Sequence, residues 1–469
     1  MTDQADSGTI PLGGGTGHAV VIGGGLAGVT AALGLADAGV RVTLLEGRPR
    51  LGGLAFSFRR GDLTVDNGQH VYLRCCTAYR QFLERIDAAH LAPVQDRLDV
   101  PVLDAGTGRL GRLRRTQAPV PLHLAGGLAL YPHLSVRERA SVARAALALR
   151  RLDPADPALD DRDFGSWLRA HGQSPRTIAA LWDLVGVATL NARADDSSLA
   201  LAAKVFRTGL LTEPGAADIG WAHVPLGELH DTLARRALDK AGVTTRLRAR
   251  VSAVEAADGG GWRVRTEDGV LDADTVVLAV AQPDAHQLLP AGALDHPERL
   301  AALGTSPILN VHVVYDRKVL RRPFFAALGS PVQWVFDRTA PSGLTGPGQY
   351  LALSQSAVGE EIDAPVSTLR ARYLPELERL LPAARGAGIR DFFVTRERTA
   401  TFDPAPGGRR LRPGNTTRAP GLYLAGAWTD TGWPATMEGA VRSGSDAARA
   451  ALASLGRTGA HLFHFQEAA

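Results

Sequence analysis

Three glycines near the N-terminus, Gly23, Gly25 and Gly28, have the spacing with which a polypeptide backbone holds a pyrophosphate. The first glycine permits a tight turn, the second lets the backbone approach the phosphates, and the third lets a helix pack closely on a strand. A helix that begins here directs free N–H groups and a partial positive charge at the anion. Glu46 stands eighteen residues after Gly28, where a carboxylate can bind ribose hydroxyls. The combination predicts dinucleotide binding.

The elements that must position these residues are legible around them. Residues 18–22 form a short apolar run typical of a buried parallel strand. Residues 26–38 are rich in alanine and leucine and stop at Gly39, as a helix does, and residues 40–45 form a second strand that ends in Glu46. This order is a βαβ unit, so we favour a phosphate-binding turn over an ordinary glycine-rich loop.

Three later segments also suit contact with a bound dinucleotide. Gly52 and Gly53 follow the second strand, where a backbone without side chains can pass close to a ligand. Residues 66–70, Asp-Asn-Gly-Gln-His, place a glycine among polar side chains. Near the C-terminus, an apolar strand at 421–425 precedes a helix at 437–455, and this second strand-turn-helix junction offers N–H groups to an anion.

Composition excludes several classes of protein. Apolar residues make up 45% and charged residues 21% of the 469, which is globular and not disordered composition. No apolar run is long enough to span a membrane, and the start of the chain shows no secretory signal. The two cysteines, Cys75 and Cys76, are adjacent, which excludes a disulfide scaffold and fits a reducing, cytoplasmic compartment. Neither a metal-ligand spacing nor a like-charge block is present, so we expect no metal and no nucleic acid.

The distribution of strands predicts the fold class and the domains. Strand-rich segments bracket two insertions, which predicts an α/β protein with a discontinuous Rossmann-like domain and an inserted α+β substrate domain. The expected segments are a disordered leader at 1–16, a dinucleotide-binding domain at 17–75, 222–289 and 391–455, a substrate-binding domain at 76–221 and 290–390, and a C-terminal tail at 456–469.

One helix in the first insertion has two interpretations. Ser135 and Glu138 form a capping box, and Val136, Ala140, Ala143 and Leu147 recur at helical spacing with arginines beside them. Packing inside the domain is the preferred interpretation, because amphipathic helices usually pack. The alternative is that the helix rests on a membrane surface.

The motifs together resemble a known superfamily. Residues 23–28, Glu46, the Gly52-Gly53 pair and residues 424–440 are similar to the FAD-dependent amine oxidases and phytoene desaturases. More closely, residues 66–71, 334–338 and 425–440, with Leu190-Asn191, resemble the hydroxysqualene dehydroxylases, FAD-dependent desaturase-like enzymes of hopanoid synthesis. The resemblance runs from about residue 18 to residue 452. It implies a FAD-binding domain of the glutathione-reductase and amine-oxidase type.

The resemblance also implies roles for individual residues. The glycine turn would hold the pyrophosphate, Glu46 the adenosine ribose, and Val251 the adenine through its backbone. Gln69 and His70 would approach the flavin, and the backbone at 437–439 would hold its pyrimidine end. The implied cofactor-binding residues are Gly23, Gly25, Leu26, Ala27, Gly28, Glu46, Arg48, Gly52, Gly53, Leu54, Gln69, His70, Val251, Gly426, Ala427, Met437, Glu438 and Gly439.

Two positions depart from the family pattern. Leu54 stands where the family often has arginine, and Ala427 stands where it usually has an aspartate that accepts a ribityl hydroxyl bond. Loss of that acceptor is expected to weaken FAD binding by about 1–3 kcal/mol if the hydroxyl is left unpaired.

The implied reaction is reductive removal of the hydroxyl of hydroxysqualene, an apolar isoprenoid. Such a site needs a dry apolar tunnel, a proton donor and aromatic faces beside a developing cation. His70 is the first candidate for the donor, with hydrogen bonding to flavin or backbone as the alternative role. Trp433 and Trp182 are candidates for the aromatic faces or for plain core packing, and Asn191 either orients substrate or caps a helix. Functional coupling to other squalene-pathway enzymes and a peripheral membrane contact are also expected.

Three other functions stay open from the residues alone. A carotenoid-type desaturase shares the fold and the cofactor but removes electrons from its hydrocarbon. A flavin amine oxidase is less favoured because none of the three lysines, Lys204, Lys240 and Lys318, lies in a flavin-contacting motif. An isoprenoid carrier without catalysis is disfavoured by the intact phosphate-binding glycines.

Overall fold

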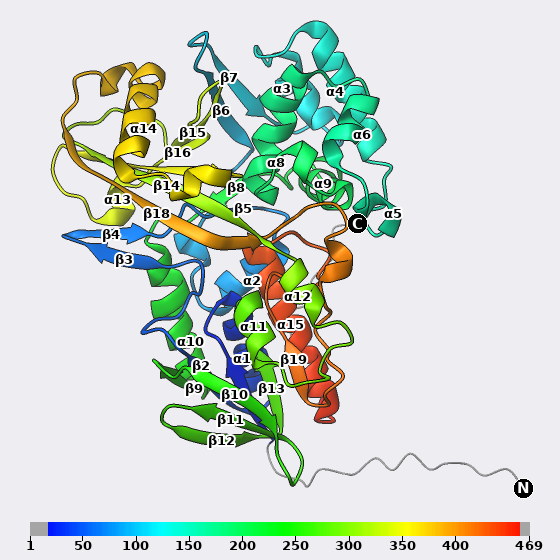
Figure 1. The fold of residues 1–469 in the computed structure, drawn as a ribbon. Coiled ribbons are helices and arrows are strands. Elements are labelled where there is room, and N and C mark those ends of the chain that lie inside the picture. Colours follow the sequence, from blue (N-terminus) through cyan, green and yellow to red (C-terminus); the bar gives the residue numbers. More distant parts are fainter. Residues whose placement is uncertain (1–16, 460–469) are drawn as a thin grey trace, which may run out of the picture.

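The computed structural model describes residues 17–459, so the predicted leader at 1–16 and the end of the predicted tail lie outside the described residues. Figure 1 shows the first strands and helix of the chain, with the last helix beside them, in the lower half of the molecule. A large sheet lies above them on one side and a group of helices above them on the other. No helix within the described range is long and apolar enough to cross a membrane.

The lower half is built on a five-stranded sheet in the order β19-β13-β1-β2-β9, with every neighbouring pair parallel. Its strands are β1 (His18–Ile22), β2 (Arg41–Glu46), β9 (Thr244–Leu247), β13 (Thr275–Leu278) and β19 (Leu422–Leu424). The strands come from three well-separated stretches of the chain. The predicted βαβ unit is confirmed, because β1 and β2 pair in parallel around one helix.

Two helices from opposite ends of the chain pack on this sheet. α1 (Leu26–Asp37) follows β1, and α15 (Met437–Ser454) follows β19. A Cβ built on Gly444 of α15 would overlap the Ala27 carbonyl oxygen of α1, so the two backbones are in close contact. α2 (Thr77–Arg85) and α10 (Ala234–Lys240) pack nearby, and a three-stranded antiparallel sheet extends the lower half. That sheet contains β10 (Val251–Ala256), β11 (Trp262–Thr266) and β12 (Gly269–Ala273).

The upper half contains a seven-stranded sheet in the order β18-β14-β17-β16-β15-β6-β7. The strands are β6 (Asp99–Asp104), β7 (Leu110–Arg114), β14 (Thr305–Tyr315), β15 (Phe324–Leu328), β16 (Trp334–Asp337), β17 (Gln349–Ser356) and β18 (Ile389–Phe402). β18 pairs with β14 along most of its length. The predicted domain boundary at residue 391 is therefore wrong in this respect, because residues 391–402 complete the upper sheet instead of the dinucleotide-binding sheet. α14 (Val366–Leu380) packs on this sheet.

Two short two-stranded ladders connect the halves. β3 (Ser57–Arg60) pairs with β4 (Leu63–Asp66), and β5 (Val71–Leu73) pairs with β8 (Ile219–Trp221). The segment between β4 and β5 holds residues 67–70 of the predicted flavin-contacting motif. The remaining short helices are α3 (Ala125–Ala129), α5 (Pro157–Asp160), α7 (Pro175–Thr177), α11 (Gln282–Leu288), α12 (Glu298–Ala302) and α13 (Thr339–Ser342).

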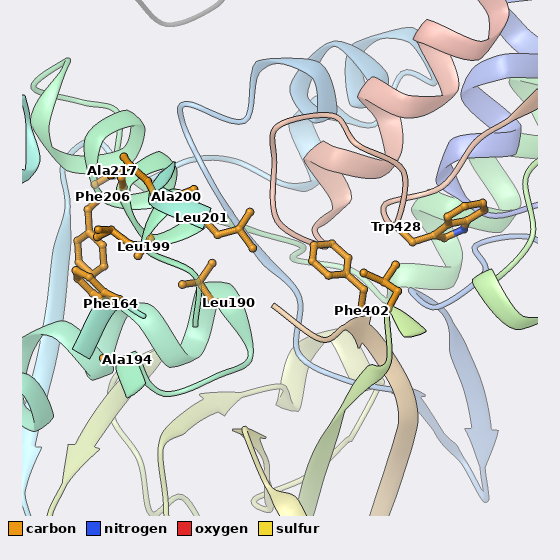
Figure 2. Close-up of a cluster of buried hydrophobic side chains, with 14 of the residues drawn as sticks. Phe164, Leu190, Ala194, Leu199, Ala200, Leu201, Phe206, Ala217, Phe402 and Trp428 are labelled. Carbon is orange, nitrogen blue, oxygen red and sulfur yellow. The ribbon is translucent and has the colours of Figure 1, made fainter. Parts of the chain in front are cut away.

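The helical group of the upper half surrounds one apolar core. Its main helices are α4 (Val136–Leu149), α6 (Phe164–Ala170), α8 (Asp183–Leu190) and α9 (Leu199–Phe206). The capping box predicted at Ser135 and Glu138 is confirmed. Figure 2 shows Leu190 and Leu201 between the Phe164–Phe206 pair and the side chains of Phe402 and Trp428, all members of one buried cluster. The helices are thus packed continuously onto the C-terminal segment that carries the second predicted flavin motif.

Candidate functional site

The glycine turn is shaped by two contacts that exclude any side chain. A Cβ on Gly23, whose φ is +107°, would overlap the Ala279 carbonyl oxygen, and a Cβ on Gly28 would overlap the Gly23 carbonyl oxygen. These two glycines are therefore required by the fold itself. Leu26 and Ala27 are buried in the first turn of α1, where their N–H groups belong to the free end of the helix.

Gly25 differs from its two neighbours in the motif. Its φ of −74° is open to any residue, and a Cβ built there meets only the Gly53 Cα, at 3.7 Å. The fold alone therefore does not demand glycine at this position. Space beside the first turn of a helix is what a pyrophosphate requires, so the residues present fit a bound dinucleotide.

The double glycine after β2 completes this cradle. Gly52 N donates to Gly24 O at 2.9 Å, and a Cβ on Gly53 would lie 2.9 Å from the Gly25 Cα. Arg50, which the sequence analysis did not select, donates to the carbonyls of Leu51 and Gly53 and lies over the Phe56 ring at 3.4 Å. The two loops therefore meet backbone to backbone. Leu54 is 45% exposed beside them, and its carbonyl oxygen accepts from Asn67 Nδ2 at 2.9 Å.

Glu46 ends β2 with its carboxylate turned over the glycine loop. Its Oε2 accepts from Gly24 N and its Oε1 from Arg48 N, both at 2.7 Å. The Arg48 side chain itself is exposed. Backbone bonds from Ala249 to Glu46 and from Arg248 to Arg48 bring the start of β10, and with it Val251, to the same end of the sheet. The adenosine-side residues predicted from sequence are thus brought together.

The C-terminal motif is held by buried hydroxyls and one buried arginine. Gly426 N donates to Ser443 Oγ at 3.0 Å, and Thr436 caps α15 by accepting from Gly439 N at 3.1 Å. Arg412 donates to the carbonyls of residues 427, 428 and 429 and lies over the Phe402 ring. Burial lowers the pKa of Arg412 to about 10, so the guanidinium remains a cation behind Ala427. Sequence spacing gave no sign of Arg412.

Met437 and Glu438 begin α15, but the Glu438 side chain turns away from the junction. Its carboxylate accepts from Ala78 N and Tyr79 N and pairs with Arg442 Nε at 2.7 Å. Burial raises the pKa of this carboxyl, while Arg442 and the N–H donors of α2 favour its charged form. Glu438 therefore ties α15 to α2, which leaves only its backbone for a cofactor.

His70 is half-buried at the end of the flavin-contacting motif. Its Nδ1 lies 3.1 Å from the Gly68 carbonyl oxygen, so Nδ1 carries the proton and Nε2 is the acceptor. Burial lowers the pKa of His70 below its usual 6.5, against the opposing charges of Asp66 and Glu397. The ring is neutral at pH 7, and this geometry favours hydrogen bonding over proton donation.

A chain of buried hydrogen bonds fixes the loop that precedes His70. Thr395 Oγ1 donates to Asn67 O at 2.6 Å and lies 3.0 Å from His312 Nε2, and His312 Nδ1 lies 2.7 Å from Tyr350 OH. Burial lowers the pKa of His312 to about 3, so the ring is neutral and accepts from Tyr350 while donating to Thr395. The chain ends on a backbone carbonyl, which cannot pass a proton on. It therefore positions residues 67–70.

A small pocket adjoins this loop. Its lining includes Gly68, Gln69, His312 and Tyr350, together with the buried Asp66–Arg338 ion pair at 2.8 Å. Gln69 Oε1 is buried and has no hydrogen-bond partner within residues 17–459. The pocket thus offers polar groups directly behind the predicted flavin contact. No group of His, Cys, Asp and Glu side chains in that range is arranged to hold a metal ion.

The aromatic candidates lie in different surroundings. Trp433 has a cation on its ring from each of two elements, with Lys204 Nζ at 5.1 Å and the Arg442 guanidinium at 4.9 Å. Lys204 therefore reaches the C-terminal flavin motif in space, although no motif of the sequence contains it. Trp182 donates to Gln173 and packs against Phe164 and Phe206, which favours its core-packing interpretation.

Asn191 ends α8 in the left-handed conformation, with φ +58°. Its Nδ2 donates to Ser306 O and Thr401 Oγ1, and its Oδ1 accepts from Ala357 N. These bonds join α8 to the strand ends β14, β17 and β18. The arrangement favours a capping and bracing role over substrate contact.

Comparisons with known proteins agree with this geometry. The family model described as flavin containing amine oxidoreductase matches residues 26–452. Hydroxysqualene dehydroxylase of Rhodopseudomonas palustris is 31% identical, over 92% of this chain and 98% of its own length. Zeta-carotene desaturase of Synechocystis is 24% identical, over 93% and 97% of the two chains. The structure of cyclohexylamine oxidase from Brevibacterium oxydans superposes with a TM-score of 0.68 at 18% identity, covering 94% of this chain and 99% of that one.

These likenesses confirm the predicted fold class, a Rossmann-like FAD-binding domain with a second sheet and helices. They also confirm the predicted resemblance to the hydroxysqualene dehydroxylases. The cradle between Gly25 and Gly53 suits the cofactor of that family. The chain therefore belongs to the flavin-containing amine oxidoreductase family and is an FAD-dependent oxidoreductase.

Proposed function

We propose that this enzyme removes the hydroxyl of hydroxysqualene reductively to give squalene. The observation that carries the proposal is the 31% identity to a hydroxysqualene dehydroxylase along nearly the full length of both chains. The dinucleotide cradle described above supports it, because the reaction needs a bound redox cofactor. Similarity to zeta-carotene desaturase keeps a carotenoid-type desaturation as the second candidate.

The proposed reaction balances as follows. The allylic carbon–oxygen bond breaks, the oxygen leaves as water after gaining one proton, and the carbon receives a hydride. Reduced FAD supplies the hydride when it is bound. The remaining tasks fall to the protein, which must exclude bulk water, hold the alcohol and admit one proton.

Within this proposal, His70 orients the alcohol. Its neutral ring has Nδ1–H bonded to Gly68 O and Nε2 free to accept, so a substrate hydroxyl can donate to Nε2. The apolar side chains of the helical group, which extend to Phe402 and Trp428, are the residue types expected to line a site for the hydrocarbon part of the substrate. Trp433 has cations on its ring and is assigned to shaping the C-terminal motif, not to stabilising a substrate cation.

The proposal extends to cellular context. We assign the enzyme to the cytoplasm with peripheral contact to the membrane, because a C30 alcohol partitions into lipid and must be taken from it. Functional coupling to the enzymes that form the alcohol and consume squalene follows from the same solubility argument. The adjacent free Cys75 and Cys76 fit a reducing compartment.

An anaerobic titration tests the function directly. Purified enzyme is reduced with dithionite, then mixed with hydroxysqualene while the flavin absorbance is followed and the products are extracted. Return of the oxidised flavin bands together with squalene supports the proposal. If the reduced flavin ignores hydroxysqualene, and the oxidised flavin of untreated enzyme is instead reduced by phytoene or zeta-carotene, desaturation is supported. Reduction by putrescine or cyclohexylamine would move the enzyme to the amine oxidases.

A further inference from the structure

One stretch of the chain concentrates positive charge. Residues 109–151 contain nine arginines and one acidic residue, Glu138, a formal charge of +8. Since the whole chain carries +4, the remaining residues sum to −4. The single acid is occupied, because Glu138 accepts from Ser135 in the capping box and from Ser174 Oγ. The formal charge is therefore distributed unevenly along the chain.

The same stretch exposes apolar side chains. Of the nine large apolar side chains that are exposed in the part of the chain that the structure describes, five lie between residues 110 and 147. Leu130 at 83% and Val136 at 79% are the most exposed of all nine, and Leu122 at 60% follows. Exposed apolar side chains that gather in one place mark an interaction site more often than scattered ones do.

Helix α4 presents its apolar stripe outward. The residues predicted from periodicity to form that stripe, Val136, Ala140, Ala143 and Leu147, are all exposed. The helix packs on the protein through a different face, which carries Val142, Ala145 and Leu149. The helix thus packs inside the domain, as the preferred interpretation expects, but a second apolar row faces the core and the predicted stripe does not. Figure 1 shows α3 and α4 in the upper half, away from the five-stranded sheet.

This surface is rigidly built. The capping box fixes the start of α4, and Arg139 Nη1 donates to Ala129 O at the end of α3. Three neighbouring arginines are already paired, Arg112 and Arg114 with Asp99 and Arg115 with Asp218. By contrast, Arg137, Arg144 and Arg150 are exposed and have no carboxylate within 4.0 Å among residues 17–459. The exposed arginines of α4 therefore lie beside its exposed apolar stripe on one fixed helix.

We infer that this surface, the α3–α4 face made of Leu122, Leu130, Val136, Leu147, Arg137 and Arg144, docks on an anionic lipid bilayer. A basic helix with an exposed apolar stripe is suited to the headgroup boundary, where leucines enter the acyl region and arginines meet phosphates. A second copy of the chain is a poor occupant because two such basic faces repel each other. A nucleic acid would neutralise the arginines but leave the leucines in water.

The inference deepens the proposed function and rests on it only for its purpose, the supply of a substrate dissolved in lipid. The inner face of α4 belongs to the same apolar cluster as Phe402 and Trp428. A bilayer on the exposed stripe of α4 would therefore contact a helix whose inner face joins the apolar core that includes Phe402 and Trp428.

Vesicle flotation with the full-length holoenzyme tests the docking. We expect it to float with vesicles that contain phosphatidylglycerol, and at least about tenfold less with pure phosphatidylcholine or in high salt. The double variant Leu130→Asp/Val136→Asp should lose binding about tenfold or more. The matched control, Val270→Asp/Val366→Asp, changes two other exposed valines far along the chain and should float like the wild type. Arg137→Gln/Arg144→Gln should weaken binding only to the anionic vesicles.

Wild-type protein that stays soluble with anionic vesicles at low salt would overturn the inference, as would equal loss in the control variant. Salt-sensitive binding to an RNA oligonucleotide that ignores Leu130→Asp/Val136→Asp, without vesicle binding, would assign the face to nucleic acid. Dehydroxylation of detergent-dispersed hydroxysqualene separates the two proposals. Activity without vesicle binding leaves the function standing and removes the docking, and binding without activity does the reverse.

Discussion

Gly25 and Gly53 oppose each other across two loops, with a Cβ built on Gly53 only 2.9 Å from the Gly25 Cα. Gly53 also has a φ of +55°, which disfavours side chains, whereas the Gly25 backbone accepts any residue. The contact lies at the start of α1, where phosphates are expected to bind. The fold therefore requires glycine at position 53, whereas at position 25 the bound cofactor is expected to require it.

Gly25→Ala should fold and lose flavin. Its added methyl meets ordinary van der Waals distances within the protein but occupies the space beside the helix N-terminus. We expect the apoprotein to unfold within a few degrees of wild type while the flavin-to-protein absorbance ratio falls sharply. Gly28→Ala is the contrasting variant, because its methyl overlaps the Gly23 carbonyl and should destabilise the apoprotein itself. Normal flavin content in Gly25→Ala would contradict the proposed cradle.

Ala427→Asp should tighten FAD binding. A carboxylate at this position is what the family pattern supplies for a ribityl hydroxyl, and the gain expected from one such bond is about 1–3 kcal/mol. The dissociation constant, measured by quenching of FAD fluorescence on the apoprotein, would then fall about 5- to 150-fold. Ala427→Asn controls for pairing of the new charge with Arg412. An unchanged constant in both variants would mean that backbone donors already satisfy the cofactor.

Stability should fall as pH drops below about 6.5. Burial holds the pKa of His312 at about 3 and that of His230 at about 4. Between these values and pH 6.5, both histidines are protonated in the unfolded chain and neutral in the folded chain. The contribution of each histidine to the free energy of unfolding is complete above pH 6.5, the pKa of the unfolded state. It falls by about 1.4 kcal/mol per pH unit as the pH drops from there to the pKa of the folded state. Thermal unfolding of the apoprotein from pH 7 to pH 5 measures this slope.

Replacing His312 gives the matched test of that slope. His312→Gln should reduce the pH dependence by about one proton, whereas His286→Gln, at an exposed helix position, controls for the loss of a histidine as such. A slope identical in wild type and His312→Gln would contradict the assignment of a neutral buried ring.

Tyr350→Phe should loosen the loop at residues 67–70. The substitution removes the hydroxyl that donates to His312 Nδ1 and leaves a buried acceptor unpaired, at a cost of about 1–3 kcal/mol. Tyr315→Phe is the control, because its buried hydroxyl has no partner within residues 17–459 and its loss should be nearly neutral. A positioning role further predicts a shifted flavin absorption band in Tyr350→Phe alone. Equal spectra in both variants would leave a purely structural role.

His70→Ala should retain flavin and lose activity. If His70 orients the alcohol through Nε2, its loss should lower kcat about 10²-fold while the flavin-to-protein ratio stays near wild type. Because its pKa is depressed, activity should not fall on going from pH 6.5 to 7.5, as it would if a protonated ring were the acid. Full activity in His70→Ala would remove the residue from the mechanism.

Local signals in the sequence were sufficient for the dinucleotide turn. Gly23, Gly28 and Glu46 lie within one βαβ unit, so their spacing along the chain determines their relative positions in the structure. The sequence also indicated that α1 and α15 each follow a strand and a glycine. The close packing of these two helices on each other is seen only in the structure. The family resemblance then indicated the cofactor, which spacing alone left open.

Contacts between segments that are far apart in the chain could not be predicted from the sequence. The pairing of β18 with β14, the chain from Tyr350 to Asn67, and Arg412 behind Ala427 all join residues far apart in the chain, and no local period marks them. The α4 stripe shows a second limit. Periodicity located an amphipathic helix correctly, but which of its two apolar rows faces the core depends on the neighbours that pack against it.

The discontinuous sheet has a consequence for synthesis of the protein. The phosphate turn is translated long before β19 and α15, which complete that sheet and pack on α1. At typical elongation rates of about 5–20 residues per second, roughly 20–80 seconds separate the synthesis of β1 and β2 from that of α15. During that interval, α1 lacks α15, the helix that packs closely on it in the folded protein. The complete sheet, with both strand-turn-helix junctions that the cofactor is expected to contact, therefore exists only once α15 has been synthesised.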